Sequence, residues 1–203
     1  HVAAYGAQHV SIISQTPAPP HRVFIFRFSS LGDIILTTPA VEALKTAWPD
    51  TRLIFCVKAG LETLVAHNPH IDEVVALGAS ETTRSFRQRL NLSADDAILD
   101  LHGKLRSKLI RWFSPVKHSS VWHKRPWQDN LPVRLGLRPY KPTMTIADRY
   151  HAAVEALVGH SLERGHLRCF PAPNADAVIT SILRKAGLDL ERPFIGMSPG
   201  AKW

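Results

Sequence analysis

The sequence predicts an α/β protein built on an open, doubly wound parallel sheet with helices on both faces. Short apolar runs rich in β-forming residues recur roughly every 22 to 29 residues, and segments with helical apolar spacing lie between them. Strands that alternate with helices form parallel sheets that are covered on both faces. Ligands of such sheets bind beyond the carboxyl ends of the strands, so we expect the functional site there.

Five strands are expected in the first part of the chain. Each is a run of four to six mostly apolar residues: VFIFRF (23–28), RLIFCV (52–57), EVVAL (73–77), AILDL (97–101) and SVWH (120–123). Runs of this length rich in β-branched and aromatic residues are typical of buried strands.

Four helices are expected between and beside these strands. Each has apolar residues at helical spacing that would face the sheet. The stripes are Ile34, Ile35, Val41, Leu44 and Trp48 in the first; Leu61, Leu64 and Val65 in the second; Phe86 and Leu90 in the third; Leu105, Leu109 and Phe113 in the fourth.

The chain divides into three parts. Residues 1–20 have no periodicity and a proline-rich end, so they are interpreted as a flexible tail or a remnant foreign to the fold. Residues 21–172 form the sheet domain, with a loop over 124–142 that holds four prolines and a helix over 146–159 that ends at Gly159. Residues 173–203 start a second domain, with a helix over 175–188 and a strand over 193–198.

Composition excludes several classes of protein. A chain of 203 residues that is 45% apolar can bury a sizeable core, and its apolar runs are far shorter than the roughly 18 to 20 residues that span a bilayer. No basic start precedes a secretory apolar core. Cys56 and Cys169 lie far apart in runs typical of buried strands, so neither a disulfide framework nor a metal-ligand spacing is present, and we expect buried free thiols in a reducing compartment.

The positive charge is concentrated in one segment. Between Leu101 and Pro142 the sequence has ten Lys or Arg residues and one acid, Asp129, while the whole chain has a formal net charge of +8. Such a segment favours an anionic partner, such as phosphorylated lipid, a phosphosugar or nucleic acid, although a merely solvated basic face has the same composition.

The turn after the first strand has two possible roles. Ser30-Leu31-Gly32-Asp33 has the spacing of a capping box, in which Ser30 caps the helix and an acid three residues later bonds back to it. The same turn lies where parallel sheets place phosphates and reacting groups. The sequence has no G-x-G-x-x-G motif and no P-loop, so neither a dinucleotide fingerprint nor an NTP-binding loop is present.

Four segments resemble a known family. RFSSLGDIILTTPAVEALKTAWPDTRLIFCV is similar to the start of the ADP-heptose:lipopolysaccharide heptosyltransferases, glycosyltransferase family nine, which begin with a strand, Lys/Arg-x-Ser-Ser-x-Gly-Asp, and a helix with Thr-x-Pro. The segment from Asp100 to Ser107 resembles the family's D-L-x-G-x-x-R-S, the segment 148–159 its inter-domain helix, and the segment 198–203 its P-G-A-x-W. The resemblance covers residues 21–203. Thr145 stands where the family often has His, and it is given no role.

The resemblance implies a GT-B fold, of which this chain has the N-terminal Rossmann-like half and the first elements of the C-terminal half. It implies inverting sugar transfer without a metal, with Asp33 as the general base. Such a single displacement needs one carboxylate to accept the proton of the attacking hydroxyl. His102 is a weaker alternative for this base, and helix capping remains the alternative role of Asp33.

The resemblance also assigns binding roles to two groups of residues. For the acceptor they are Ser29, Ser30, Gly32, His102, Gly103, Lys104 and Arg106; for the donor they are Ser198, Gly200, Ala201 and Lys202. Both groups have a structural alternative, a helix cap for the serines and an ordinary helix surface for Lys104 and Arg106. No metal ligand and no cofactor are expected, because Asp95-Asp96 reads as a turn before a strand and the nucleotide sugar is a substrate.

The resemblance implies an ADP-sugar donor, a phosphorylated lipopolysaccharide inner-core acceptor, and a cytoplasmic location at the inner membrane of a Gram-negative bacterium. Trp112, Trp122 and Trp127 alternate with cations and suit either a headgroup surface or a core. We expect these 203 residues alone to lack most of the donor site and to be inactive in sugar transfer. The competing reading is a non-catalytic Rossmann-like domain that binds anions or nucleic acid through residues 104–141; a related nucleotide-sugar enzyme such as an epimerase is less favoured.

Overall fold

The computed structural model describes residues 18–122 and 144–197, and the statements that follow concern these residues. The predictions for Trp127, for the whole loop over 124–142 and for the donor-binding residues lie outside this range. The donor-binding residues are Ser198, Gly200, Ala201 and Lys202.

A five-stranded parallel sheet forms the centre of the molecule. Its strands are β1 (Arg22–Phe26), β2 (Arg52–Lys58), β3 (Glu73–Leu77), β4 (Ala97–Asp100) and β5 (His118–Val121), in the order β3-β2-β1-β4-β5. The predicted strands are confirmed, with β5 starting at His118 rather than Ser120. The strands β1, β2 and β3 follow one another toward one edge of the sheet, and β4 and β5 toward the other, so the strand order reverses next to β1. The carboxyl ends of β1 and β4 therefore border the switch point, where doubly wound sheets bind ligands.

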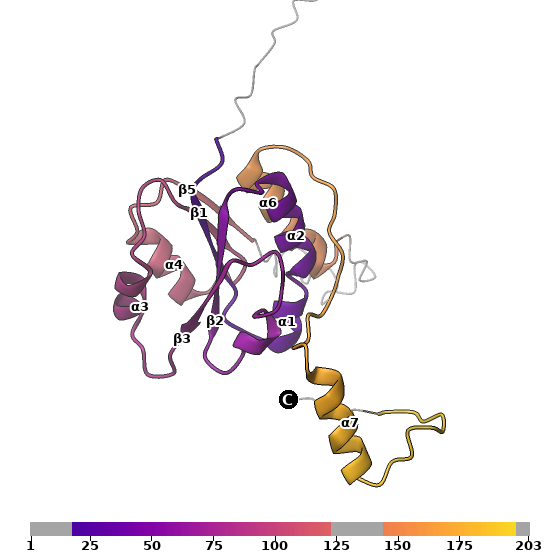
Figure 1. The fold of residues 1–203 in the computed structure, drawn as a ribbon. Coiled ribbons are helices and arrows are strands. Elements are labelled where there is room, and N and C mark those ends of the chain that lie inside the picture. The colour runs from indigo at the N-terminus through magenta and orange to yellow at the C-terminus, as the bar shows by residue number, and fades with distance from the viewer. Residues whose placement is uncertain (1–17, 123–143, 198–203) are drawn as a thin grey trace, which may run out of the picture.

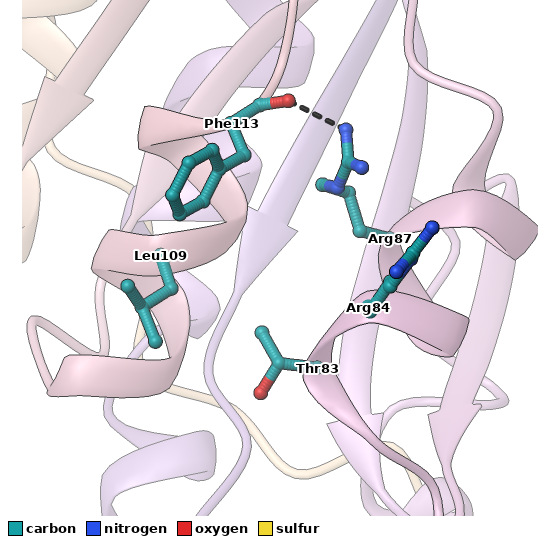
Figure 2. Close-up of a pocket in the computed structure, with 5 residues that line it drawn as sticks. All are labelled: Thr83, Arg84, Arg87, Leu109 and Phe113. Atoms are coloured by element: carbon teal, nitrogen blue, oxygen red, sulfur yellow. Dashed lines mark hydrogen bonds between the residues drawn. The ribbon is translucent and has the colours of Figure 1, made fainter.

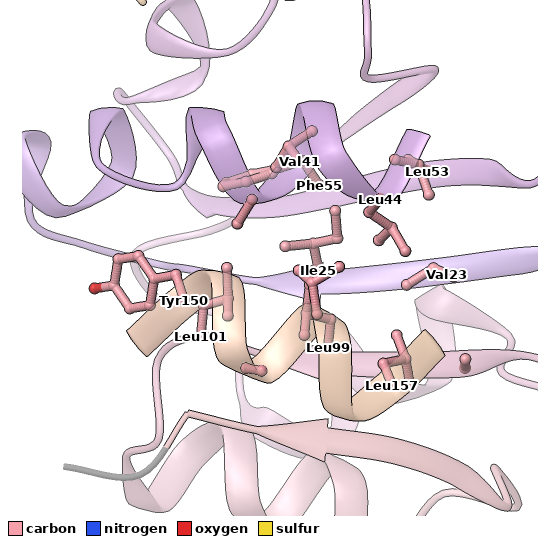
Figure 3. Close-up of a cluster of buried hydrophobic side chains, with 14 of the residues drawn as sticks. Val23, Ile25, Val41, Leu44, Leu53, Phe55, Leu99, Leu101, Tyr150 and Leu157 are labelled. Atoms are coloured by element: carbon pink, nitrogen blue, oxygen red, sulfur yellow. The ribbon is translucent and has the colours of Figure 1, made fainter. Parts of the chain in front are cut away.

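Helices cover both faces of the sheet (Figure 1). One face carries α2 (Thr38–Ala47) and α6 (Ile146–Val158), and the other carries α3 (Thr83–Leu90) and α4 (Leu105–Trp112). Alternate strand residues enter the two cores, because successive side chains of a strand point to opposite faces. Val23 and Ile25 pack under α2 and α6, as Figure 3 shows, whereas Phe24 and Phe26 pack under α3 and α4.

The first predicted helix is two helices. A short α1 (Leu31–Ile35) ends before α2 begins at Thr38. Pro39 has no amide hydrogen to continue the ladder, and the hydroxyls of Thr37 and Thr38 instead donate to the carbonyls of Ile34 and Ile35, at 2.6 and 2.9 Å. The chain changes direction at this break, between the turn that follows β1 and the helix α2, which packs on the core.

The second predicted helix is wrong in type. The residues around Leu61, Leu64 and Val65 form only one 3-10 turn, η1 (Glu62–Leu64). Gly60 has a φ of +89°, which ends regular structure before the turn, and Pro69 disfavours helical backbone at the residue before it. Between these two positions there is no room for several turns of helix.

The predicted core stripe of α4 is also wrong. Leu105 and Phe113 are 72% and 67% exposed, and the buried residues of the helix are Ser107 and Ile110. The helix itself forms where predicted, but it is rotated so that its larger apolar side chains face away from the sheet.

The helix predicted over 146–159 is confirmed as α6. α6 ends as predicted, with Gly159 in the left-handed region at a φ of +90°. From there residues 160–172 cross α2, where the amide of His166 donates to Glu42 at 2.7 Å. α7 (Ala175–Lys185) also forms as predicted but buries no residue, and Figure 1 shows it apart from the sheet.

The strand predicted over 193–198 is wrong for the residues that the structure describes. Residues 193–197 have no regular structure, and no described segment pairs with them. A strand needs a neighbour to bond its amides and carbonyls, so the apolar pattern by itself does not form one.

Candidate active site

The turn after β1 places Asp33 at the carboxyl edge of the sheet. Ser30 is the residue before α1, and Asp33 is the third residue of that helix. Oδ2 of Asp33 accepts hydrogen bonds from the Ser30 hydroxyl at 3.0 Å and the Ser30 amide at 3.3 Å. The acid therefore bonds back to the start of its helix, as the capping reading predicts.

The same oxygen of Asp33 also receives a cation. Nη2 of Arg27, the first residue after β1, forms an ion pair with Oδ2. Among the described residues, Oδ1 has no hydrogen-bond or ion-pair partner, and the Asp33 side chain is 29% exposed. One carboxylate oxygen is thus held by three polar interactions, while the other is free to accept a hydrogen bond.

The pKa of Asp33 is lower than that of an ordinary Asp. Partial burial of the carboxyl acts to raise this pKa, but the charge of Arg27 and the hydrogen bonds from Ser30 together outweigh burial. Asp33 is therefore ionised at neutral pH and able to accept a proton.

Arg27 connects the turn after β1 to the rest of the site. It is only 6% exposed, its Nη1 donates to the carbonyl of Leu101 at 2.7 Å, and its guanidinium lies 5.5 Å from the ring centre of Tyr150 and 6.0 Å from that of Trp122. An arginine surrounded by rings and a carbonyl keeps its charge in one position. It fixes the direction of the Asp33 carboxylate.

The turn after β4 forms the second side of the site. Asp100 is fully buried, and its Oδ1 accepts from the amides of His102 and Gly103 at 3.0 and 2.9 Å. Gly103 has a φ of +62°, and a Cβ there would lie 3.3 Å from the carbonyl of Trp122. Asp100 and Gly103 shape this turn, which holds the His102 ring at 5.2 Å from the ring of Phe28.

The structure brings the turns after β1 and β4 together. The pKa of His102 is lowered to about 4, first by burial and then by the charges of Arg27 and Lys104, while Asp100 and Asp33 act weakly in the opposite direction. Charges from both turns therefore reach the same imidazole, which is neutral at pH 7. A neutral imidazole can donate one hydrogen bond and accept another, so His102 can bind a polar group of a ligand.

His102 makes stability depend on pH. Its folded pKa of about 4 lies below the ordinary 6.5, so the unfolded chain binds the proton first. Stability should therefore fall as pH drops from about 6.5 to 4, by up to about 3 kcal/mol. Urea unfolding of His102→Gln should show a smaller fall over this range than the unchanged chain. Parallel curves for the two proteins would contradict the burial of a neutral His102.

Five buried polar atoms around these turns have no hydrogen-bond partner among the described residues. They are Arg27 Nε, Asp100 Oδ2, His102 Nδ1, Trp122 Nε1 and Tyr150 OH. Burial raises the pKa of Tyr150 to about 12, so its hydroxyl keeps its proton and remains a donor. Buried polar groups in folded proteins are almost always paired, so a cluster of unpaired ones indicates a place that holds water or an ion, or that has a catalytic role.

The other predicted acceptor residues lie around this cluster. Ser29 and Ser30 form the turn before α1, and open space surrounds the position where a Cβ on Gly32 would lie. Lys104 precedes α4, and its charge lowers the pKa of His102. Arg106 is exposed in the first turn of α4 and acts on the pKa of Glu81, so its charge lies toward α3.

Sequence reasoning gave no role to Arg27 and Tyr150, although both lie within matched segments. Trp122 was expected at either a headgroup surface or a core, and the structure places it at the core, with its ring edge-on to that of Tyr150 and 5.5 Å between the ring centres. Only Trp112 of the described candidate headgroup residues is strongly exposed, at 83%. The signal available in the sequence was that Arg27 is a charged residue inside a buried strand run.

The remaining predictions, on the cysteines, metals and membranes, concern other regions. Cys56 is buried as predicted, whereas Cys169 is exposed, so the prediction of a buried thiol is wrong there. Asp96 is 2% exposed and pairs with Arg22 at 2.7 Å at the amino end of β4, opposite the site, so Asp95-Asp96 is a turn as expected. Within residues 18–122 and 144–197, no group of three or more metal-ligating side chains is clustered, and no helix is long and apolar enough to cross a membrane.

Comparison with known proteins finds heptosyltransferases by sequence. Over 115 residues, half of this chain, it is 24% identical to lipopolysaccharide heptosyltransferase 1 of Escherichia coli K12. The match spans 36% of that protein, so the chain corresponds to little more than a third of its length. No family model matches the chain.

Comparison of structures finds the same group. A glycosyl transferase of family 9 from Veillonella parvula superposes with a TM-score of 0.67 at 20% identity, over 85% of this chain and 51% of that one. The E. coli ADP-heptose lipopolysaccharide heptosyltransferase II gives 0.55 at 19%, over 89% and 55%. E. coli heptosyltransferase WaaC, solved with ADP-2-deoxy-2-fluoro heptose, gives 0.54 at 21%, over 72% and 51%. The fold is that of one half of these glycosyltransferases.

Proposed function

We propose that this chain, which is similar in sequence and in fold to heptosyltransferases of glycosyltransferase family 9, is the acceptor-binding half of an inverting glycosyltransferase. The donor we propose is an ADP-sugar, ADP-heptose or a relative, and the acceptor is a lipopolysaccharide inner-core sugar. The enzyme would work on the cytoplasmic side of the inner membrane. These assignments rest on the activities in the names of the similar proteins and on the charged and polar groups of the site.

The observation that carries this proposal is the geometry of Asp33. Its Oδ2 is held by Ser30 and Arg27, which leaves Oδ1 open at the switch point of the sheet. In the proposed step, Oδ1 takes the proton of an acceptor hydroxyl as that oxygen attacks the anomeric carbon. The bond from this carbon to the nucleotide diphosphate breaks, and the diphosphate leaves with the electron pair.

The unpaired polar atoms support a polyhydroxylated acceptor. Sugar hydroxyls donate and accept hydrogen bonds, as the cluster requires: Tyr150, Trp122 and Arg27 offer donors and Asp100 offers an acceptor. Lys104 beside His102 would favour a phosphate or carboxylate on the same acceptor. No step of this proposal uses a metal ion or a cofactor.

Binding of the acceptor by this chain tests the proposal directly. The isolated chain should bind a deacylated lipopolysaccharide inner-core oligosaccharide without any nucleotide, with amide NMR shifts at Gly32, His102 and Gly103. A chain that binds ADP-sugar but shows no acceptor-dependent shifts in these turns would contradict it. Sugar transfer by the isolated chain would contradict the expectation that it lacks most of the donor site.

Gly32→Ala separates acceptor contact from helix capping. Gly32 has no positive φ and lies inside α1, so alanine should leave stability unchanged or raise it by about 0.5 kcal/mol. The added methyl enters the space where the acceptor is proposed to bind, so affinity should fall roughly tenfold, about 1.4 kcal/mol. Urea unfolding and acceptor titration measure the two effects.

Gly196→Ala is the matched control for this change. Its Cβ also meets open space, and it lies far from α1 in the chain. It should alter neither stability nor acceptor affinity. Unchanged affinity in Gly32→Ala would remove Gly32 from the acceptor site.

A further inference from the structure

The outer face of α4 carries an apolar stripe that no described residue covers. Leu105, Trp112 and Phe113 are 72%, 83% and 67% exposed, and Leu109, between them on the same helix face, is partly exposed. Fully exposed Trp and Phe side chains beside each other are unfavourable in water, since each exposes a large apolar area.

A groove continues this stripe toward α3. It has a volume of about 290 Å³ and is lined by Leu109 and Phe113 from α4 and by Thr83, Arg84 and Arg87 from α3 (Figure 2). Arg87 crosses the groove and donates to the carbonyl of Phe113 at 2.5 Å, so the apolar floor lies directly beneath guanidinium groups.

The two helices that form this face are basic throughout. They contain no acidic residue, and each carries three cations: Arg84, Arg87 and Arg89 in α3, and Arg106, Lys108 and Arg111 in α4. Of these six cations, only Arg89 forms an ion pair with an acid in the part of the chain that the structure describes, and that acid is Glu81. Long cationic side chains around exposed aromatic rings match the interface of an anionic bilayer, where rings enter the headgroup layer and cations meet phosphates.

We propose that the α3–α4 face, defined by Arg84, Arg87, Lys108, Arg111, Trp112 and Phe113, docks on the surface of an anionic phospholipid bilayer. Trp112 and Phe113 enter the headgroup layer, and the four cations contact lipid phosphates. A second copy of the chain does not suit this face, because two such surfaces would bring like charges together without a compensating acid.

Docking here would place the candidate site close to the membrane. α4 starts beside His102 through Lys104 and ends at Trp112, and eight residues of helix span about 12 Å. This inference rests on the proposed function, because it states which surface would bring the site to a lipid-linked acceptor. Its test measures lipid binding and does not measure sugar transfer, so the two proposals can fail separately.

Vesicle binding tests the inference. The chain should sediment with vesicles that contain phosphatidylcholine and about 30 mol% phosphatidylglycerol, bind neutral phosphatidylcholine vesicles far less, and be released by salt. Tryptophan emission should shift to the blue on binding, and this shift should be lost in Trp112→Phe if the other tryptophans stay out of the bilayer.

Variants assign the binding to this face. Trp112→Ser/Phe113→Ser and, separately, Arg84→Gln/Arg111→Gln should each weaken vesicle binding roughly tenfold or more. Ile195→Ser/Met197→Ser is the matched control, since these side chains are 92% and 86% exposed elsewhere, and it should bind as the unchanged chain does. Circular dichroism confirms that each variant is folded.

Three results would overturn the inference. Equal binding to neutral and anionic vesicles would remove the role of the cations. Concentration-dependent dimers without lipid that Trp112→Ser/Phe113→Ser abolishes would assign the face to a second copy. Salt-sensitive binding of oligonucleotides that competes with vesicles and depends on Arg84 and Arg111 would assign it to nucleic acid.

Discussion

Asp33→Asn is expected to lower turnover by about 10² to 10⁴ while acceptor binding is retained. The amide keeps the shape of the carboxylate and can still accept from Ser30, but it takes no proton from the attacking hydroxyl. Turnover is to be measured in a protein that joins this chain to a complete nucleotide-sugar domain. Donor affinity should stay unchanged, and near-normal turnover would exclude Asp33 as the base.

Asp148→Asn is the matched control for this experiment, because Asp148 has the same place in another capping box. It is the third residue of α6, accepts from the Thr145 amide at 2.9 Å and has a lowered pKa from these bonds. Losing this cap should cost about 1 kcal/mol of stability and leave turnover intact. Equal losses of turnover in the two variants would mean that Asp33 acts only as a cap.

The low pKa of Asp33 also predicts the acid side of the pH profile. A carboxyl whose folded pKa is depressed contributes its stabilisation above its unfolded pKa and loses it as pH falls through the lower folded value. Activity therefore should not fall between pH 7 and 5 through protonation of Asp33. A loss of activity in that window that disappears in a His102 variant would contradict the lowered pKa of His102.

Arg27→Gln is expected to have the largest effect on stability, a loss of about 2 to 3 kcal/mol. The guanidinium is buried, pairs with Asp33 and donates to Leu101, and removal of one partner leaves the carboxylate without its cation. The 29% exposure of Asp33 keeps this loss below that of a fully buried pair. The pKa of Asp33 should rise, which side-chain carbon NMR measures.

Two variants make this result specific. Arg27→Lys keeps the charge and should restore most of the stability, but it loses the planar group between the rings of Tyr150 and Trp122. Arg22→Gln breaks the ion pair with Asp96 at the opposite edge of the sheet and should lower stability without moving the pKa of Asp33. An unchanged Asp33 pKa in Arg27→Gln would show that Arg27 does not hold the carboxylate.

Much of the fold could be read from the sequence because it follows from local periodicity. The runs that became β1 to β4, and the helix α6, were predicted near their observed bounds, and α3 buries the two apolar residues predicted for it, Phe86 and Leu90. Where the prediction failed, contacts with residues distant in the sequence, or their absence, determined the structure. The apolar residues of 193–197 formed no strand without a neighbour, and α4 turned its larger apolar side chains outward because Ser107 and Ile110 fit against the sheet.

The sequence by itself determined that a carboxylate stands in the turn after the first strand of a parallel sheet, since Ser30 to Asp33 are consecutive and local pattern fixes their turn. It left the capping and catalytic roles of Asp33 as alternatives, because both use the same four residues. The tertiary structure decided which oxygen is held and which is open, through Arg27 and the turn after β4. That packing joins residues more than seventy positions apart, such as Arg27 and Leu101, and only the strand order β2-β1-β4 brings them into contact.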